Sequence, residues 1–295
     1  MTMDDGQGIY RLGWPITGVV IAILLVLSTG CYEMVEPVCD GLPAEGLERV
    51  EIHSGGGSVE IQRVSGAEFV ELDGEIHIVA SSMRSAGEQA DDITLEFYAE
   101  GNTAMLILDI PPAAQPAWAE LLLTVPEGFS SSIQTTNAPV TVEGLDGDLE
   151  VVTTNGAVTV TDVNGAVDVN TTNGKVTLTD IRGDLVGWTT NGKVSVDGHV
   201  GNFDLSTTNA PIELDSALPE GGFGYAASTN GSIDLTLPAD VSATLEARTT
   251  NGSIDIDEIA FDGQLHDDWA SVVFGDGAGE IVLSTTNGEI EVAGR

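Results

Sequence analysis

TTNGKVTLTDIRGDLVGWTTNGKV, residues 171–194, contains the motif TTNGKV at both of its ends. Related TTN or STN motifs recur along the chain at spacings of 18, 18, 18, 18, 21, 21 and 36 residues, and 36 is twice 18. A repeat of this length is too short for a helical hairpin or a propeller blade. It fits one coil of a β-solenoid, in which each coil buries its apolar side chains by stacking on its neighbours.

Apolar and polar residues alternate after each motif. Counted from the motif Asn, the third and fifth residues are aliphatic in all eight repeats, and the residue between them is Thr, Ser, Asp or Glu. This period of two predicts a half-buried strand. The tenth residue is Gly in the first four repeats, which predicts a second corner with positive φ or close backbone approach. We therefore expect an all-β, single-chain parallel β-solenoid with coils of about 18 residues, right-handed because parallel connections usually are.

The motif itself has a structural interpretation. Asn tolerates the left-handed region better than other non-glycine residues, and Asn-Gly favours turns. When identical corners stack, Asn side chains can form hydrogen bonds along the stack. We expect such a structural ladder rather than a ligand site from Asn137, Asn155, Asn173, Asn191, Asn209, Asn230, Asn251 and Asn287.

The repeated unit TTNG-x-[VI]-x-[VIL] and the segment GDGAGEIVLSTTNGEIEV, residues 275–292, resemble a bacterial domain family of unknown function catalogued as a putative adhesin. The resemblance covers about residues 46–292, although SGGGS stands where a first TTNG is expected. It implies a TTNG-repeat β-solenoid located in the cell envelope. The family's label does not by itself imply a demonstrated activity.

The composition narrows the classes of partner. The chain has 47 acidic and 9 basic residues, so its formal net charge is −38. Nucleic acid is excluded as a partner because phosphate binding needs clustered Lys and Arg. The two lysines, Lys175 and Lys193, occupy the same offset in adjacent coils. The acidic excess is interpreted as a solvated surface, with cation binding along acidic columns as the alternative.

The N-terminus predicts an extracytoplasmic location. An apolar run, residues 16–27, is followed by a sequence ending in Cys31 that resembles a bacterial lipoprotein signal. The alternative is an uncleaved anchor, because residues 14–30 are close to the length that spans a bilayer. If Cys31 carries lipid, Cys39 is unpaired; if it does not, the two can form a disulfide.

Four segments follow from these patterns. They are a signal peptide at 1–30, a lipid-anchored tether at 31–46, irregular N-terminal β coils acting as a cap at 47–134, and the regular TTNG-repeat solenoid at 135–295. The repeat fails near Trp269, where another motif Asn is expected. There Trp269 either closes the end of the core or belongs to a functional irregular coil.

Catalytic and metal-binding motifs are absent from the sequence: it has no HExxH, G-x-S-x-G, P-loop or CxxC. We expect no cofactor and no metal site; His266 with its two following Asp residues is a weak cluster. Glu213, Asp234 and Asp255 are predicted on adjacent coils about 5 Å apart, a separation that retaining glycosidases use. With the column continuing to Glu291 and no cation expected beside it, we interpret it as a solvated face.

The predicted function is that of a non-catalytic, adhesin-like envelope protein that binds a glycan, an envelope polymer or a surface protein, and that reaches the membrane through its lipid anchor. A polysaccharide-acting lyase or glycosidase and a mechanical spacer are the alternatives. The candidate ligand contacts are Trp188, expected to face outward beside the Lys193 corner, and the two lysines Lys175 and Lys193.

Overall fold

A computed structural model describes residues 23–26, 32–114 and 116–295, so Cys31 lies outside the described residues. The chain divides into unit 1, Met1–Asp146, and unit 2, Gly147–Arg295. Each unit is built almost entirely of β-strands in two sheets, which confirms the predicted all-β solenoid class. Helices long and apolar enough to cross a membrane do not occur in the described part of the chain.

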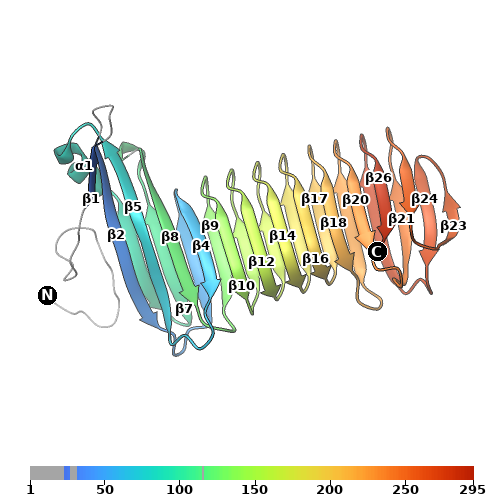
Figure 1. The fold of residues 1–295 in the computed structure, drawn as a ribbon, viewed down its shortest axis with the longest axis horizontal. Helices are drawn as coiled ribbons and strands as arrows, with labels where there is room; N and C mark the ends of the chain where they lie inside the picture. The colour runs from blue at the N-terminus through green and yellow to red at the C-terminus, as the bar shows by residue number, and fades with distance from the viewer. Residues whose placement is uncertain (1–22, 27–31, 115) are drawn as a thin grey trace. The chain divides into compact units, whose positions relative to one another are not determined.

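The described residues of unit 1 form ten strands, one short α-helix and one 3-10 turn (Figure 1). The elements are β1 (Ile23–Val26), β2 (Tyr32–Pro43), β3 (Arg49–Ser54), β4 (Ser58–Arg63), β5 (Phe69–Ala80), α1 (Met83–Ala90), β6 (Thr94–Glu100), β7 (Thr103–Asp109), η1 (Pro112–Ala114), β8 (Ala117–Val125), β9 (Ser130–Thr135) and β10 (Val140–Leu145). Sheet A1 has the order β1-β2-β5-β8-β4-β10, and sheet B1 has the order β9-β3-β7-β6. Both sheets mix parallel and antiparallel pairs.

The segment assigned to a tether is a strand. All twelve residues of β2 pair antiparallel with β5. The prolines that suggest a linker are tolerated because the other side of β2 pairs only with the short β1, so Pro37 and Pro43 interrupt no second set of hydrogen bonds. The polar stretch after β5 contains α1, where the Ser82 hydroxyl caps the helix by accepting from the Ser85 amide at 3.2 Å.

Unit 2 contains the remaining sixteen strands (Figure 1). They are β11 (Leu149–Val152), β12 (Val158–Asn164), β13 (Val167–Asn170), β14 (Val176–Arg182), β15 (Leu185–Thr189), β16 (Val194–Val200), β17 (Phe203–Thr207), β18 (Ile212–Ala217), β19 (Phe223–Ser228), β20 (Ile233–Leu237), β21 (Ala243–Arg248), β22 (Ile254–Asp257), β23 (Asp262–Leu265), β24 (Trp269–Phe274), β25 (Gly279–Thr285) and β26 (Ile290–Gly294). Sheet A2 has the order β12-β14-β16-β18-β20-β26-β22, and sheet B2 has the order β11-β13-β15-β17-β19-β25-β21-β24-β23.

The core of unit 2 is aliphatic. The third and fifth residues after each motif Asn point between the two sheets, and those of sheet A2 are at most 4% exposed except Ile256, which lies on the edge strand β22. Parallel pairing aligns these residues from coil to coil, as in Val158–Val176–Val194. Each coil therefore completes its core only against its neighbours.

Each residue of the TTNG corner has its own structural role. The first Thr is buried and its hydroxyl accepts from the Gly amide, as between Thr189 and Gly192 at 3.1 Å. A Cβ at Gly192 would overlap the carbonyl oxygen of Gly174 in the preceding coil. This position therefore requires glycine, because the two backbones approach closely. The motif Asn residues have negative φ, so left-handed geometry is not the reason for Asn.

Hydrogen bonds connect the motif Asn side chains of unit 2. In six neighbouring pairs, the Nδ2 of one Asn donates to the Oδ1 of the Asn in the adjacent coil at 2.6–2.8 Å. The spatial order is Asn155, Asn173, Asn191, Asn209, Asn230, Asn287 and Asn251. All of these side chains are exposed, so water competes for the same groups.

Asn173→Ala is expected to lower the free energy of unfolding of unit 2 by about 1 kcal/mol, because it breaks two side-chain hydrogen bonds at an exposed corner. Urea denaturation followed by circular dichroism measures the change. Thr172→Ala, at the half-buried residue beside Asn173 in the same corner, is the control. An unchanged midpoint for Asn173→Ala would show that the ladder contributes nothing to stability.

A further bend occurs within the sheet A2 strands. Asp162 and Asp180, which occupy equivalent places in adjacent coils, have φ near 55°. Gly198 occupies the same place in the following coil and has φ of 69°. Asp is among the few non-glycine residues that adopt this region at modest cost. The bend re-aims the strand so that Val163 and Ile181 are again buried. The sequence patterns did not predict this bend, because Asp is a weaker signal for positive φ than Gly.

The last coils are not stacked in the order of the sequence. Strand β25 lies between β19 and β21, and β26 lies between β20 and β22. The chain thus builds the end coil first and then returns to fill the coil beneath it. The β23–β24 hairpin continues sheet B2 beyond β21.

Trp269 does not close the core. It begins β24 on the outward side and stacks on His266, with ring centroids 4.4 Å apart. The side chains of β24 that point inward are Ala270, Val272 and Phe274, and Phe274 is fully buried. The interpretation that Trp269 closes the core was wrong, because strand alternation, which residue type alone does not reveal, assigns the tryptophan to the outer face.

His199 is fully buried at a corner of unit 2. Its Nε2 donates to the carbonyl oxygen of Gly183 at 2.9 Å, so its Nδ1 accepts from the Ser216 hydroxyl at 2.8 Å. Burial lowers the pKa of His199 from its ordinary value of 6.5, and this outweighs the opposite effects of the Gly183 hydrogen bond and the Asp184 charge.

Because the folded-state pKa of His199 is depressed, the unfolded chain takes up its proton first as the pH falls below 6.5. The neutral imidazole therefore supports stability above this value, and that stability is lost on acidification towards the folded-state pKa. We expect the difference in unfolding free energy between the native chain and His199→Gln to shrink from about pH 8 to about pH 5. A difference that does not change with pH would contradict this assignment.

Candidate ligand-binding face

Trp188 lies on the outer face of sheet B2. In β15, Leu185, Gly187 and Thr189 point inward, while Trp188 is 44% exposed. Its cross-strand neighbours are Asn170 on β13 and Ser206 on β17. Because both neighbours have short side chains, the indole stands free above the sheet. A large exposed aromatic on a flat strand surface is a typical stacking platform for a ligand.

A second aromatic residue shares this face. Tyr225 projects outward from β19, two strands from β15, in the row formed by Asp168, Val186, Asp204, Tyr225 and Val282. Asp204 therefore lies between the strand of Trp188 and that of Tyr225, and it is exposed. We call Trp188, Asp204 and Tyr225, with Asp168 and Val186, the platform. Only its tryptophan was predicted from the sequence, because Tyr225 lies within the 21-residue coil between Asn209 and Asn230, whose second strand is displaced in the repeat.

The lysines do not belong to this platform. Lys175 and Lys193 precede β14 and β16 of sheet A2, after the corner that follows sheet B2. The outer faces of the two sheets point in opposite directions, so neither lysine can share a flat ligand with Trp188. Lys193 instead forms an ion pair with Glu213. The prediction that no cation neighbours the acidic column was therefore wrong.

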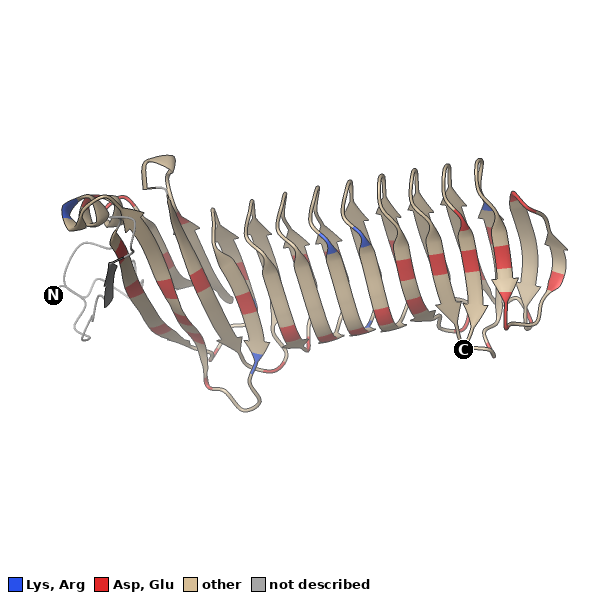
Figure 2. Ribbon diagram, turned by 45° about the horizontal axis from the view of Figure 1, so that its top comes forward, with Lys and Arg blue, Asp and Glu red and all other residues tan. Residues whose placement is uncertain are grey.

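Sheet A2 carries a column of carboxylates on its outer face. Glu213, Asp234, Glu291 and Asp255 occupy successive strands in that order, because β26 is inserted between β20 and β22. Figure 2 shows these acidic bands on neighbouring strands of unit 2. Asp234 and Asp255, expected on adjacent coils, are separated by Glu291.

An open groove of about 540 Å³ follows this column across β16, β18, β20 and β26. Its polar lining is formed by Ser195, Asp197, Glu213, Asp215, Asp234, Thr236 and Glu291. At one end Arg295 pairs with Asp215 at 2.9 Å. Burial raises the pKa of Asp234, and the charges of Glu291 and Glu213 raise it further, while Lys193 opposes them. The groove is thus acidic, with cations at its margins.

The pKa of Asp168, which belongs to the platform, is also raised. Burial raises the pKa of Asp168, and the charge of Glu150 on β11 adds to this, while a hydrogen bond from Asn170 at 2.6 Å opposes it. Glu150 and Asp168 are direct cross-strand neighbours. Like charges in that position repel each other, so a cation at this face is favoured electrostatically.

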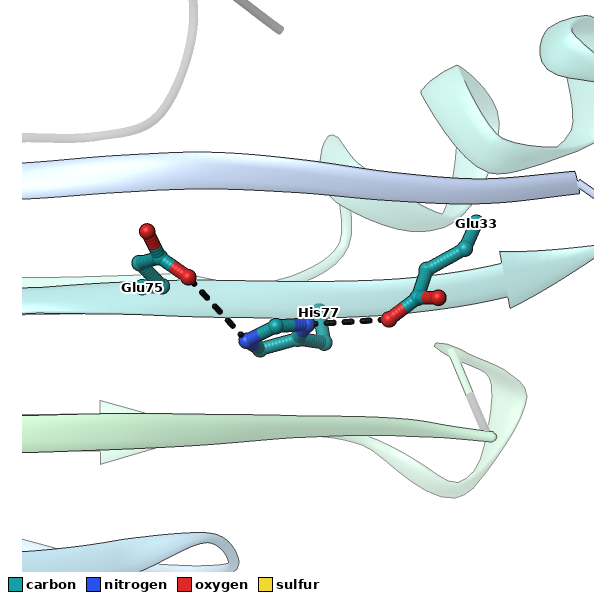
Figure 3. Close-up of polar contacts among 3 residues, drawn as sticks. All are labelled: Glu33, Glu75 and His77. Carbon is teal, nitrogen blue, oxygen red and sulfur yellow. Dashed lines mark hydrogen bonds and ion pairs between the residues drawn. The ribbon is translucent and has the colours of Figure 1, made fainter. Parts of the chain in front are cut away.

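A polar cluster on the outer face of sheet A1 was not foreseen. Figure 3 shows His77 of β5 between two carboxylates: its Nδ1 lies 3.0 Å from Glu33 Oε1 on β2, and its Nε2 lies 3.5 Å from Glu75 Oε2. The imidazole stacks on Trp118 of β8, with centroids 4.9 Å apart and planes 3° apart. The side chains of His77 and Glu33 are only 14% and 17% exposed.

This His77 cluster connects neighbouring strands and has a structural role. It joins β2, β5 and β8 through one side chain, and it contains no nucleophile among the residues described. A lone His with a partner 44 residues away leaves no local signal in the sequence. Within the described part of the chain, no group of three or more His, Cys, Asp or Glu side chains is arranged to hold a metal ion.

Two-sheet coils with stacked motif corners and an exposed aromatic face define a repeat protein of the single-chain β-solenoid class. The chain belongs to the Toastrack DUF4097 family, whose model matches residues 117–293. None of the curated proteins matches the sequence.

Two solved structures are similar to the chain. One is a putative cell adhesion protein from Clostridium sporogenes ATCC 15579, with 12% identity, a TM-score of 0.24, and coverage of 88% of this chain and 100% of that chain. The other is a putative adhesin from Bacteroides fragilis NCTC 9343, with 16% identity, a TM-score of 0.36, and coverage of 87% of this chain and 96% of that chain.

Proposed function

We propose that this chain is a non-catalytic, adhesin-like binding protein of the bacterial cell envelope, and that the outer face of sheet B2 binds a glycan. The observation that carries the proposal is the 44% exposure of Trp188 between short side chains on a flat sheet. Aromatic rings in such positions stack on the apolar faces of sugar rings, while neighbouring Asp, Asn and Ser side chains can bind the hydroxyl groups.

The test is retention of the full chain, purified in detergent, on immobilised polysaccharides and peptidoglycan. Trp188→Ala is expected to weaken retention at least about tenfold, as for loss of a central aromatic contact. Phe69→Ala is the matched control, because Phe69 is equally exposed, at 43%, but lies on β5 of unit 1. Retention that is the same for Trp188→Ala and the native chain would reject this face as the site.

We also propose that the chain is extracytoplasmic and anchored through lipid on Cys31. The small residues before Cys31 and the apolar run preceding them support this. Metabolic labelling with a clickable fatty acid should label the native chain and not Cys31→Ser, while Cys39→Ser remains labelled. An uncleaved, unlabelled chain in the membrane fraction would instead support the anchor alternative.

A second candidate function is glycan cleavage in the groove of sheet A2. It is favoured by the raised pKa of Asp234, because a carboxyl group whose pKa is raised can act as a general acid, and by Glu213, which is its direct neighbour on the adjacent strand. Adjacent strands lie about 4.8 Å apart, close to the carboxylate separation in retaining glycosidases. Release of new reducing ends, abolished by both Asp234→Asn and Glu213→Gln, would establish it; no release in the same retention assay would exclude it for the sugars tested.

A further inference from the structure

Resting on the proposed function, we propose that the platform of sheet B2 selects a cationic glycan, an extended polymer of amino sugars with free amines. Its rings would stack on Trp188 and Tyr225, and its ammonium groups would pair with Asp204 and Asp168. The chain of sugars would run across the strands, because the two aromatic residues lie on different strands of the sheet.

The spacing of the aromatic residues requires an extended ligand. Trp188 and Tyr225 are two strands and two residues apart, which corresponds to roughly 12 Å between their Cα atoms. One sugar ring cannot contact both. Val186, 43% exposed, lies on β15 two residues before Trp188 and extends the apolar surface to the row of Asp204 and Tyr225. The Tyr225 hydroxyl has no hydrogen-bond partner among the described residues and is available to a ligand.

The charge of the face selects the class of glycan. The outward residues of sheet B2 include the carboxylates Glu150, Asp168, Asp204, Glu246 and Glu280, and the exposed Asp184 immediately precedes β15. The cation on the same face is Arg248, two strands beyond Tyr225 in sheet B2. A polyanionic glycan would be repelled, whereas an ammonium group is attracted both by Asp204 and by the faces of the flanking aromatic rings.

The sheet topology favours a glycan over a peptide. Strands β13, β15, β17 and β19 are each paired on both sides, so their backbone groups are already hydrogen-bonded. A peptide therefore cannot add to the platform as a further strand, which is the usual way in which extended peptides bind sheets. Ligands must instead use side-chain contacts, and sugar rings make such contacts with aromatic faces.

The experiment measures binding of the full chain to a glucosamine hexamer with free amines, its N-acetylated form, a glucose hexamer and a lysine hexamer. The free-amine sugar is expected to bind at least about tenfold more tightly than the N-acetylated sugar at low salt, and to lose this advantage at high salt. Trp188→Ala and Tyr225→Ala should each weaken the binding of both the free-amine and the N-acetylated hexamer. Asp204→Asn should reduce the preference for free amines while leaving the N-acetylated sugar unaffected.

Two variants control for general effects. Asp73→Asn removes the same charge from an exposed position of β5 in unit 1, and Phe69→Ala removes an exposed aromatic there; both should bind as the native chain does. Equal binding of all three sugars would overturn the cationic selection and leave the proposed glycan binding intact. The glycan assignment would be overturned if the lysine hexamer bound as tightly as the free-amine sugar and if Trp188→Ala did not change the affinity of the lysine hexamer. Failure to bind any sugar would overturn both proposals.

Discussion

Gly192→Ala is expected to lower the free energy of unfolding by about 3 kcal/mol, one of the largest effects of a single added methyl group in this chain. The new Cβ would overlap the carbonyl oxygen of Gly174 and crowd the Thr189 hydroxyl that closes the corner. The obstacle is backbone held by hydrogen bonds on both sides, so the coils must separate to relieve it. Denaturation in urea, monitored by circular dichroism, measures the loss.

The chain supplies its own control for this substitution. Ala210 occupies the equivalent place in the next coil, where the motif reads TTNAP and Pro211 follows. There the Thr207 hydroxyl donates to the Gly192 carbonyl oxygen at 3.3 Å, a different use of the corner Thr. The double variant Gly192→Ala/Lys193→Pro, which copies that corner, should recover part of the loss. Full stability of Gly192→Ala alone would refute the close-approach explanation.

Phe203→Ala is expected to cost about 4 kcal/mol, the usual range for removing a buried phenylalanine. Phe203 is 1% exposed and fills the core beside Gly224, where any Cβ would overlap the ring. Its neighbour on the other side is Leu185, and the residue beyond Gly224 is Ile281, so Gly224 is the one small residue in this stretch of the inward column and leaves room for the ring. The free energy of unfolding, measured as for Gly192→Ala, gives the cost.

The pairing of Phe203 with Gly224 makes a second, sharper prediction within the same experiment. Gly224→Ala alone should be destabilising because the ring has no room to move. Combined with Phe203→Leu, it should cost less than the sum of the two single changes, with a coupling of about 1 kcal/mol or more. Strict additivity would indicate that the two side chains do not share this space.

The regular coils could be predicted because their signals are local and repeated. The 18-residue spacing and the aliphatic third and fifth positions determine both strand alternation and parallel alignment, and the structure has them in register. The spatial order of the last coils could not be predicted, because their corner motifs are the same. Asn230, Asn251 and Asn287 carry equivalent corners, so the sequence alone does not reveal that Asn287 lies between the other two.

Long-range side-chain contacts were beyond the sequence patterns. His77 and Glu33 lie on strands that pair antiparallel, in a part of the chain without repeats. Lys193 reaches Glu213 diagonally, although the direct neighbour of Glu213 on β16 is Ser195. The outward position of Trp188 follows from the repeat register, whereas its companion Tyr225 depends on how the longer coil is accommodated.

The inserted last coil has a consequence for biosynthesis. A chain that emerges from the ribosome or translocon cannot assemble unit 2 coil by coil, because β25 and β26, the strands that join β21 and β22 to the preceding coils, belong to residues 279–294. Until then, the edges of β19 and β20 on one side and of β21 and β22 on the other remain unpaired. A product that stops before residue 279 lacks β25 and β26, so it exposes unpaired strand edges that favour aggregation or proteolysis. The last two strands therefore distinguish a finished unit 2 from a truncated one.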